Sequence, residues 1–199
     1  MDDEPQAVSD LLEDWREDAS HRVVDLVFVR GKSYRARVRR AVGPRAAKAV
    51  HRGIVRMLGH RSGTSYEDLY VYDLRDGPLI GSTVTARVPK RVEFTDGLRV
   101  ATSFAVKGGA EVVIVHNHPG SMPPSAPDIL SLEATGAKRG VIACHDGSLY
   151  VFEIVGEPAP GYTIDNDRVD RIQELWGADE ARLLRAFRDE LGVHIEHIR

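Results

Sequence analysis

The chain's 199 residues are enough for one α/β domain with extensions, and a hydrophobic share of 42% can fill a single core. One cysteine, Cys144, excludes internal disulfides and indicates a reducing compartment, which we expect to be the cytoplasm. No segment is long and apolar enough to span a membrane, the acidic start differs from a signal peptide, and a net charge of −3 excludes no class of partner.

The N-terminal part combines an acidic leader with a basic segment. Residues 1–20 are rich in Asp and Glu around a few apolar residues, and we expect a mobile leader that carries a short helix. The apolar run at residues 23–29 predicts the first strand. Residues 30–61 contain no Asp or Glu, and residues 44–58 have the spacing of an amphipathic helix that Gly59 ends.

The outer side of that helix would carry a line of cations. A basic stripe can bind nucleic acid or an acidic protein tail. The ordinary interpretation, which we favour, is a solvated helix face that the acidic leader partly neutralises. No aromatic residues alternate with the cations, which argues against binding of single strands by stacking. The cations are Arg45, Lys48, Arg52 and Arg56.

Two carboxylates stand just ahead of a predicted hairpin. Glu67 and Asp68 are neighbours at the start of an alternating strand, so their side chains should lie on opposite faces. An Arg-Asp-Gly-Pro turn separates this strand from its return strand, and two glycines end the helix that follows. The expected elements are a strand at 69–74, a turn at 75–78, a return strand from 79 to 81, a strand-like run at 87–94 and a helix at about 96–106.

The most informative segment places metal-ligand side chains between a strand and a helix. The β-branched run 112–115 predicts a buried strand, and His116 and His118 follow on one face of it. After a Pro/Gly loop, Ser125 is a good helix N-cap and Asp128 falls in the first turn. Two imidazoles and one carboxylate leave one tetrahedral position open, as in catalytic zinc sites.

Other interpretations of this segment are weaker. Ser125 and Asp128 would also form a capping pair in a protein without a metal, because the helix dipole favours a carboxylate there. Asn117 points to the opposite strand face, and we expect it to fix a loop by hydrogen bonds rather than to bind metal. The His-Asn-His run does not indicate an HNH nuclease, whose residues are spread over separate elements.

The C-terminal third predicts a second hairpin and two helices. Asp146-Gly147 joins strands at 141–145 and 148–155, and His145 beside the turn is expected to be exposed. Residues 157–161 form a linker. Helices are expected at 167–176 and 178–191, with apolar side chains available for docking or for a homodimer contact. These side chains are Trp176, Leu183, Leu184, Phe187 and Leu191.

The metal-ligand segment resembles the JAMM metalloprotease family (JAB1/MPN, Mov34), including its bacterial RadC-like branch. That family's pattern is a distant Glu, then His-x-His, ten residues and Asp, with a Ser three residues before the Asp. Here nine residues separate His118 from Asp128, which we interpret as a subgroup feature. The resemblance covers roughly residues 67–155. It implies an α-β-α sandwich of the JAB1/MPN (cytidine-deaminase-like) type, with a central mixed sheet and added C-terminal helices. The matching residues are His116, His118, Ser125 and Asp128.

The resemblance also implies a mechanism with one Zn²⁺ per chain. In the family a glutamate activates a zinc-bound water, and Glu67 is our first choice for it. Ser125 would donate a hydrogen bond to the developing oxyanion. The bond cleaved would be an amide, which in this family is often an isopeptide on a ubiquitin-like tail. The other glutamates considered are Glu93, the main rival, and Glu111 and Glu133.

The expected protein is therefore a cytoplasmic zinc-dependent metallopeptidase or isopeptidase. Residues 1–20 would be its leader, residues 21–156 its JAB/MPN-like metalloprotease domain, and residues 157–199 a helical extension. One alternative is a RadC-like module that binds DNA or protein without peptidase activity. A second is zinc-dependent hydrolysis of another kind of bond, because the ligand set alone does not name the substrate.

Overall fold

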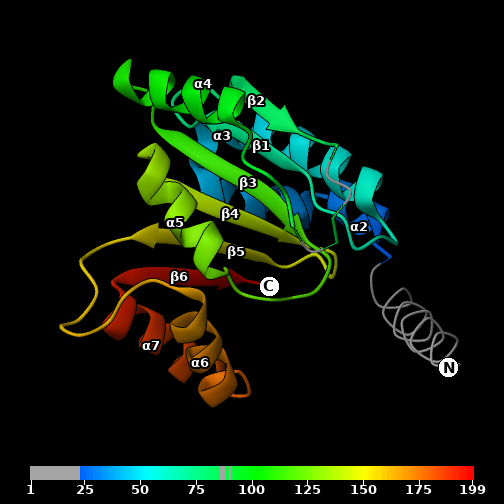
Figure 1. Ribbon diagram of the computed structural model, residues 1–199. Coiled ribbons are helices and arrows are strands. Elements are labelled where there is room, and N and C mark those ends of the chain that lie inside the picture. The colour runs from blue at the N-terminus through cyan, green and yellow to red at the C-terminus, as the bar shows by residue number, and fades with distance from the viewer. Residues whose placement is uncertain (1–22, 86–87, 90) are drawn as a thin grey trace, which may run out of the picture.

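The protein has a mixed α/β fold, which confirms the expected class (Figure 1). A computed structural model describes residues 23–85, 88–89 and 91–199. Its six-stranded sheet has the order β2-β1-β3-β4-β5-β6, in which β3 and β4 are parallel and the other neighbours are antiparallel. The strands are β1 (Leu69–Asp73), β2 (Leu79–Thr83), β3 (Val112–His118), β4 (Arg139–Cys144), β5 (Leu149–Ile154) and β6 (Val193–Ile198).

Helices cover both faces of the sheet, and each face has its own core. Side chains alternate along β3, so that Val113 and Val115 pack with α3 while Val112 and Ile114 pack with α5. The result is three layers, visible in Figure 1 as helices behind and in front of the strands. The helices are α2 (Leu26–Arg30) and α3 (Lys32–Arg61) on one side, with α4 (Asp96–Lys107), α5 (Ala126–Thr135), α6 (Asn166–Trp176) and α7 (Glu180–Leu191) on the other.

The predicted first strand is wrong, because part of residues 23–29 forms helix α2. Asp25 is the reason. Its carboxylate accepts hydrogen bonds from the backbone N–H groups of Val27 and Phe28, so it acts as an N-cap inside the apolar run. The acidic leader at residues 1–20 lies outside the described residues.

The basic helix is longer than predicted. Helix α3 continues past Gly59 to Arg61, and a further helical stretch from Lys32 precedes the predicted one. The two stretches meet at Gly43, whose φ of 78° is accessible to glycine, and Pro44 starts the second stretch. The helix expected at 44–58 is thus confirmed from its start at Pro44, but it ends at Arg61, beyond the predicted end.

The middle and the second hairpin agree largely with expectation. Strands β1 and β2, helix α4 and the β4–β5 hairpin lie where the sequence predicts them. Gly147 in the second turn has a φ of 83°, as a turn of this kind requires. The prediction of a strand-like run at 87–94 was wrong for the described residues between 88 and 94, which lie outside any strand. Val92 and Phe94 nevertheless pack against the second core. Cys144 is buried, and burial raises the pKa of its thiol to about 12.

The C-terminal segment adds a strand that sequence reasoning missed. Helices α6 and α7 occur as expected, but β6 follows them and pairs with β5 along its whole length. Leu183, Phe187 and Leu191 of α7 are buried in the second core. Homodimerisation through these helices stays a prediction, and it would have to use other side chains. None of the helices in the described part of the chain combines the length and the apolar character that a membrane crossing needs.

Truncation of Phe187 should show how much the packing of α7 against the sheet contributes to the free energy of unfolding. This ring is fully buried, so Phe187→Ala is expected to lower the free energy of unfolding by about 3–5 kcal/mol. Phe104 on α4 is 79% exposed, and Phe104→Ala should change the same quantity by less than about 0.5 kcal/mol. Urea denaturation of both variants provides the measurement. Equal costs would contradict the described packing of α7.

Candidate metal centre

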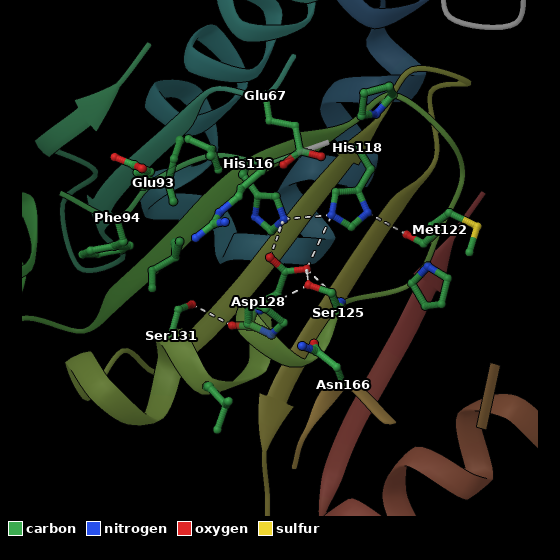
Figure 2. A pocket seen from close by; sticks show the side chains of 18 of the residues that line it. Glu67, Glu93, Phe94, His116, His118, Met122, Ser125, Asp128, Ser131 and Asn166 are labelled. Atoms are coloured by element: carbon green, nitrogen blue, oxygen red, sulfur yellow. Dashed lines mark hydrogen bonds and ion pairs between the residues drawn. The ribbon is translucent and has the colours of Figure 1, made fainter. Parts of the chain in front are cut away.

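Three metal-ligand side chains converge where β3 ends and α5 begins (Figure 2). His116 Nε2 lies 3.1 Å from His118 Nε2 and 3.1 Å from one carboxylate oxygen of Asp128, and His118 Nε2 lies 3.5 Å from the other oxygen. Ligand atoms about 2.0–2.1 Å from a tetrahedral zinc stand roughly 3.3 Å apart, so these separations suit one ion. The cluster could hold a metal ion, as the sequence predicts.

Strand periodicity and the parallel crossover explain this convergence. His116 and His118 are two residues apart on β3 and therefore share the face that carries Ile114. Because β3 and β4 are parallel, α5 must cross back over the sheet, and its N-terminus comes to lie above the carboxyl end of β3. Asp128 in the first turn of α5 thus faces the two rings.

Charges and hydrogen bonds prepare the cluster for a cation. His118 Nδ1 lies 3.1 Å from the Met122 carbonyl oxygen and donates to it, so the neutral ring presents the lone pair of Nε2 to the cluster. Burial by itself would raise the pKa of Asp128, but the two imidazoles beside it hold that pKa well below its usual range. Burial likewise opposes the charge of His118, yet the bond to Asp128 leaves its pKa raised. A positive charge between these groups, a proton or a metal ion, is therefore stabilised.

Ser125 serves as both helix cap and support for the carboxylate ligand. Its hydroxyl donates to Asp128 Oδ2 at 2.6 Å, and its backbone N–H donates to the same oxygen at 2.8 Å. In return Ser125 Oγ accepts from the Asp128 backbone N–H, which completes a capping box. The structural and the functional interpretations of this pair are thus compatible, because the cap orients the ligand.

Ser125→Ala should weaken metal binding roughly 10- to 100-fold, because it removes a hydrogen bond that orients a ligand. It should also cost about 1 kcal/mol of stability through loss of the cap. Thr95→Ala is the matched control, since Thr95 caps α4 by accepting from the Leu98 N–H. That variant should lose similar stability and keep the wild-type zinc affinity. Competition against a chromophoric zinc chelator measures the affinities; equal zinc affinities in the two variants would contradict the support role.

Glu67 lies on the same face as the ligands. Leu69 of β1 pairs with His116, and continuing that register brings Glu67 level with His118. Figure 2 shows its carboxylate beside the two rings. Glu67 is only 5% exposed, and this burial raises the pKa of its carboxyl group although His116 and His118 act in the opposite direction.

The rival glutamates lie in other surroundings. Glu93 is exposed and lines the same cleft, but Figure 2 places it beside Phe94, away from the imidazoles. Glu111 pairs with Lys138 at 2.7 Å on the surface, and Glu133 is exposed on α5. Asp68, as expected, faces the other side of the sheet, where it pairs with Arg61.

Asn117 fixes a loop, as expected from the sequence. It is completely buried on the α3 side of β3 and hydrogen-bonds the backbone at Tyr66 and Asp68. The expectation that His145 is exposed was wrong, since it is 2% exposed with its Nε2 3.2 Å from Asn117 Nδ2. Alternation along β4 continues past Cys144 and turns His145 towards the first core.

The three candidate ligands, His116, His118 and Asp128, line a cleft of about 1640 Å³. Its walls come from the loop after β3, from residues 91–96, from α5 and from α6. Sequence reasoning missed the loop carbonyl that holds His118 and the contribution of α6. Nothing local in the sequence could have shown that a helix beyond a Pro-rich linker returns to the site. The α6 residues at the cleft are Asn166, Asp170 and Gln173.

Comparisons of the chain with protein-family models, with curated proteins and with solved structures found no match. The geometry of the site and the chemistry of its residues therefore carry the functional argument.

Proposed function

We propose that the protein is a zinc-dependent hydrolase of amide bonds, a metallopeptidase or isopeptidase of the JAMM type on a JAB1/MPN-like sandwich. The observation that carries the proposal is the convergence of His116, His118 and Asp128 within one cleft, with a buried glutamate beside them. Two imidazoles and a carboxylate are the donor set of several catalytic zinc sites. The cleft, at about 1640 Å³, has room for several residues of a peptide or of a conjugated protein tail.

Zinc would supply the electrophile and the acidified water that amide hydrolysis needs, because it lowers the pKa of a coordinated water to near 7 and polarises carbonyl groups. Glu67 accepts the proton of the attacking water and then delivers it to the departing amine as the C–N bond breaks. Its burial supports this role, because a desolvated carboxylate is a stronger base than an exposed one. No covalent enzyme intermediate is required.

Ser125 has two tasks in this proposal. It orients Asp128 in the structure, and its hydroxyl would donate to the oxyanion that develops on the substrate carbonyl. The second task requires the hydroxyl to turn away from Asp128, whose oxygen then keeps the hydrogen bond from the Ser125 backbone N–H.

Two amide probes test the proposal. Zinc-loaded protein is incubated with isopeptide-linked diubiquitin and with a library of internally quenched fluorescent peptides. Cleavage of at least one probe should stop after the metal is stripped with 1,10-phenanthroline and return when Zn²⁺ is added. A protein that binds one zinc per chain yet cleaves esters only would be a zinc hydrolase of another kind. Cleavage of no probe by the zinc-loaded protein would overturn the proposal.

A second candidate function, binding of DNA, rests on the outer face of α3. The four cations predicted for the stretch 44–58 are all exposed, and α3 covers the side of the sheet opposite the candidate metal ligands. Reversal of these charges should remove any salt-dependent affinity for duplex DNA, measured by fluorescence anisotropy at two salt concentrations. Absence of such affinity in the unaltered protein excludes this candidate. The residues to reverse are Arg45, Lys48, Arg52 and Arg56.

A further inference from the structure

Asn117, which lies between the two histidines in the sequence, is hydrogen-bonded through its side chain to the segment that carries Glu67. Asn117 Oδ1 accepts a hydrogen bond from the Asp68 N–H at 2.8 Å, and Asn117 Nδ2 donates to the Tyr66 carbonyl at 3.1 Å. The Tyr66 carbonyl belongs to the peptide unit before Glu67, and the Asp68 N–H belongs to the unit after it. One amide therefore holds both peptide units that flank Glu67.

The Asn117 side chain supplies hydrogen bonds beyond the point where the backbone pairing of β1 with β3 ends. The pairing of β1 with β3 stops at Leu69 and His116, so no strand pairing fixes residues 66–68. One partner of the amide is a donor and the other an acceptor, which determines the orientation of the Asn117 amide group. Its second N–H points at His145 Nε2, 3.2 Å away. A primary amide is suited to this position, because it supplies a donor and an acceptor on a short, completely buried side chain.

The rest of the segment is held on the same side of the sheet. The Asp68 carboxylate is completely buried and accepts hydrogen bonds from Arg61 and His60. Among the described residues, the hydrogen bonds that restrain this segment go to its backbone and to Asp68, and none is made to the Glu67 carboxylate. The direction of Glu67 towards the imidazoles thus depends on its backbone.

We infer that Asn117 is a positioning residue: it links the strand that carries the metal ligands to the peptide units around Glu67, and so sets the distance between the general base and the metal. The inference rests on the proposed function for its catalytic part. Its structural part is independent, because the two hydrogen bonds exist without a metal. A displacement of about 1 Å in a catalytic group can lower the rate 10²-fold. A link that fixes the position of Glu67 should therefore affect kcat.

Hydrogen exchange of backbone amides tests the structural part in protein treated with EDTA. In Asn117→Leu, which has a similar volume without hydrogen bonds, the Asp68 amide should exchange at least about tenfold faster than in the wild type. The amides of β1 paired with β3 should keep their protection. Val115→Ala is the matched control, because Val115 is buried on the same strand face and contributes only packing. That variant loses stability, and its Asp68 amide should remain protected relative to the β1 amides.

Zinc content and kinetics test the catalytic part. Asn117→Leu should still bind one zinc per chain, since the zinc ligands lie on the opposite face of β3 from residue 117. Its kcat should fall roughly 10- to 100-fold, while its KM stays within about twofold of the wild type. Asn117→Asp keeps the acceptor for Asp68 and loses the donor to Tyr66, so its kcat should be intermediate. Val115→Ala should keep the wild-type kcat.

The outcomes separate the two proposals. An unchanged Asp68 exchange rate or an unchanged kcat in Asn117→Leu would overturn the positioning role, as would a loss of zinc as large as the loss of kcat. If the wild type cleaves neither amide probe, the proposed function fails, and the exchange rate of Asp68 alone then decides whether Asn117 holds the Glu67 segment.

Discussion

Replacing Asp128 with alanine is expected to reduce zinc binding from one ion per chain to almost none at micromolar zinc. Asp128 supplies the carboxylate that faces both imidazoles, at 3.1 and 3.5 Å, and two adjacent imidazoles alone form a weaker site. The loss of affinity should exceed the roughly 100-fold that follows from removing an outer hydrogen-bond partner. Metal analysis after dialysis and competition with a chelator measure it. Full zinc occupancy in the variant would refute the assignment of the site.

Two further variants separate loss of a ligand from loss of structure. Asp128→Ala also removes the acceptor of the Ser125 N–H and weakens the start of α5. Asp128→Asn keeps an oxygen that can accept this bond, so it should retain the helix and still bind zinc poorly, because an amide is a neutral and weaker ligand. Asp167→Ala removes an exposed carboxylate from the first turn of α6 and should leave zinc binding unchanged.

The convergence of the three candidate metal ligands was predictable because the position of each follows from a local rule. Two residues on one strand share a face, a proline ends the strand, and a Ser followed by an acid three positions later starts a helix. These rules placed His116, His118 and Asp128 on neighbouring elements before any tertiary information. The position of Glu67 needed one more step, the pairing of β1 with β3, and its proximity to the histidines was an expectation that local rules could not establish.

The errors also have physical causes. A short apolar run does not distinguish a strand from a buried helix, and at the N-terminus the capping by Asp25 decided for the helix. The alternation of Val193 and Ile195 after Gly192 is a strand signal, but it is short and follows a long helical pattern. The contribution of α6 to the cleft and the link from Asn117 to Glu67 depend on contacts between distant segments.

Glu67→Gln should leave zinc bound and lower kcat by roughly 10²- to 10⁴-fold, the range that a general base contributes. The amide of glutamine has nearly the shape of the carboxylate but cannot accept a proton from water. Glu93→Gln is the matched comparison and should keep kcat within about twofold of the wild type. The reverse result, a large loss in Glu93→Gln and a small one in Glu67→Gln, would assign the base to Glu93. Initial rates with the cleaved amide probe and parallel zinc analysis provide both numbers.

In the metal-free protein, Glu67→Gln should have a larger free energy of unfolding than the wild type, and the difference should depend on pH. Burial raises the pKa of Glu67 above its value in the unfolded chain, so the folded state binds the proton more tightly than the unfolded state. The wild type therefore loses stability as the pH rises through the folded pKa of Glu67, whereas Glu67→Gln does not titrate there. Urea denaturation in EDTA should show a larger advantage of the variant at pH 8 than at pH 4.5. Zinc should reduce this advantage, because its charge stabilises the ionised carboxylate of the wild type. An advantage that is independent of both pH and zinc would mean that Glu67 carries no desolvated charge beside the candidate metal ligands.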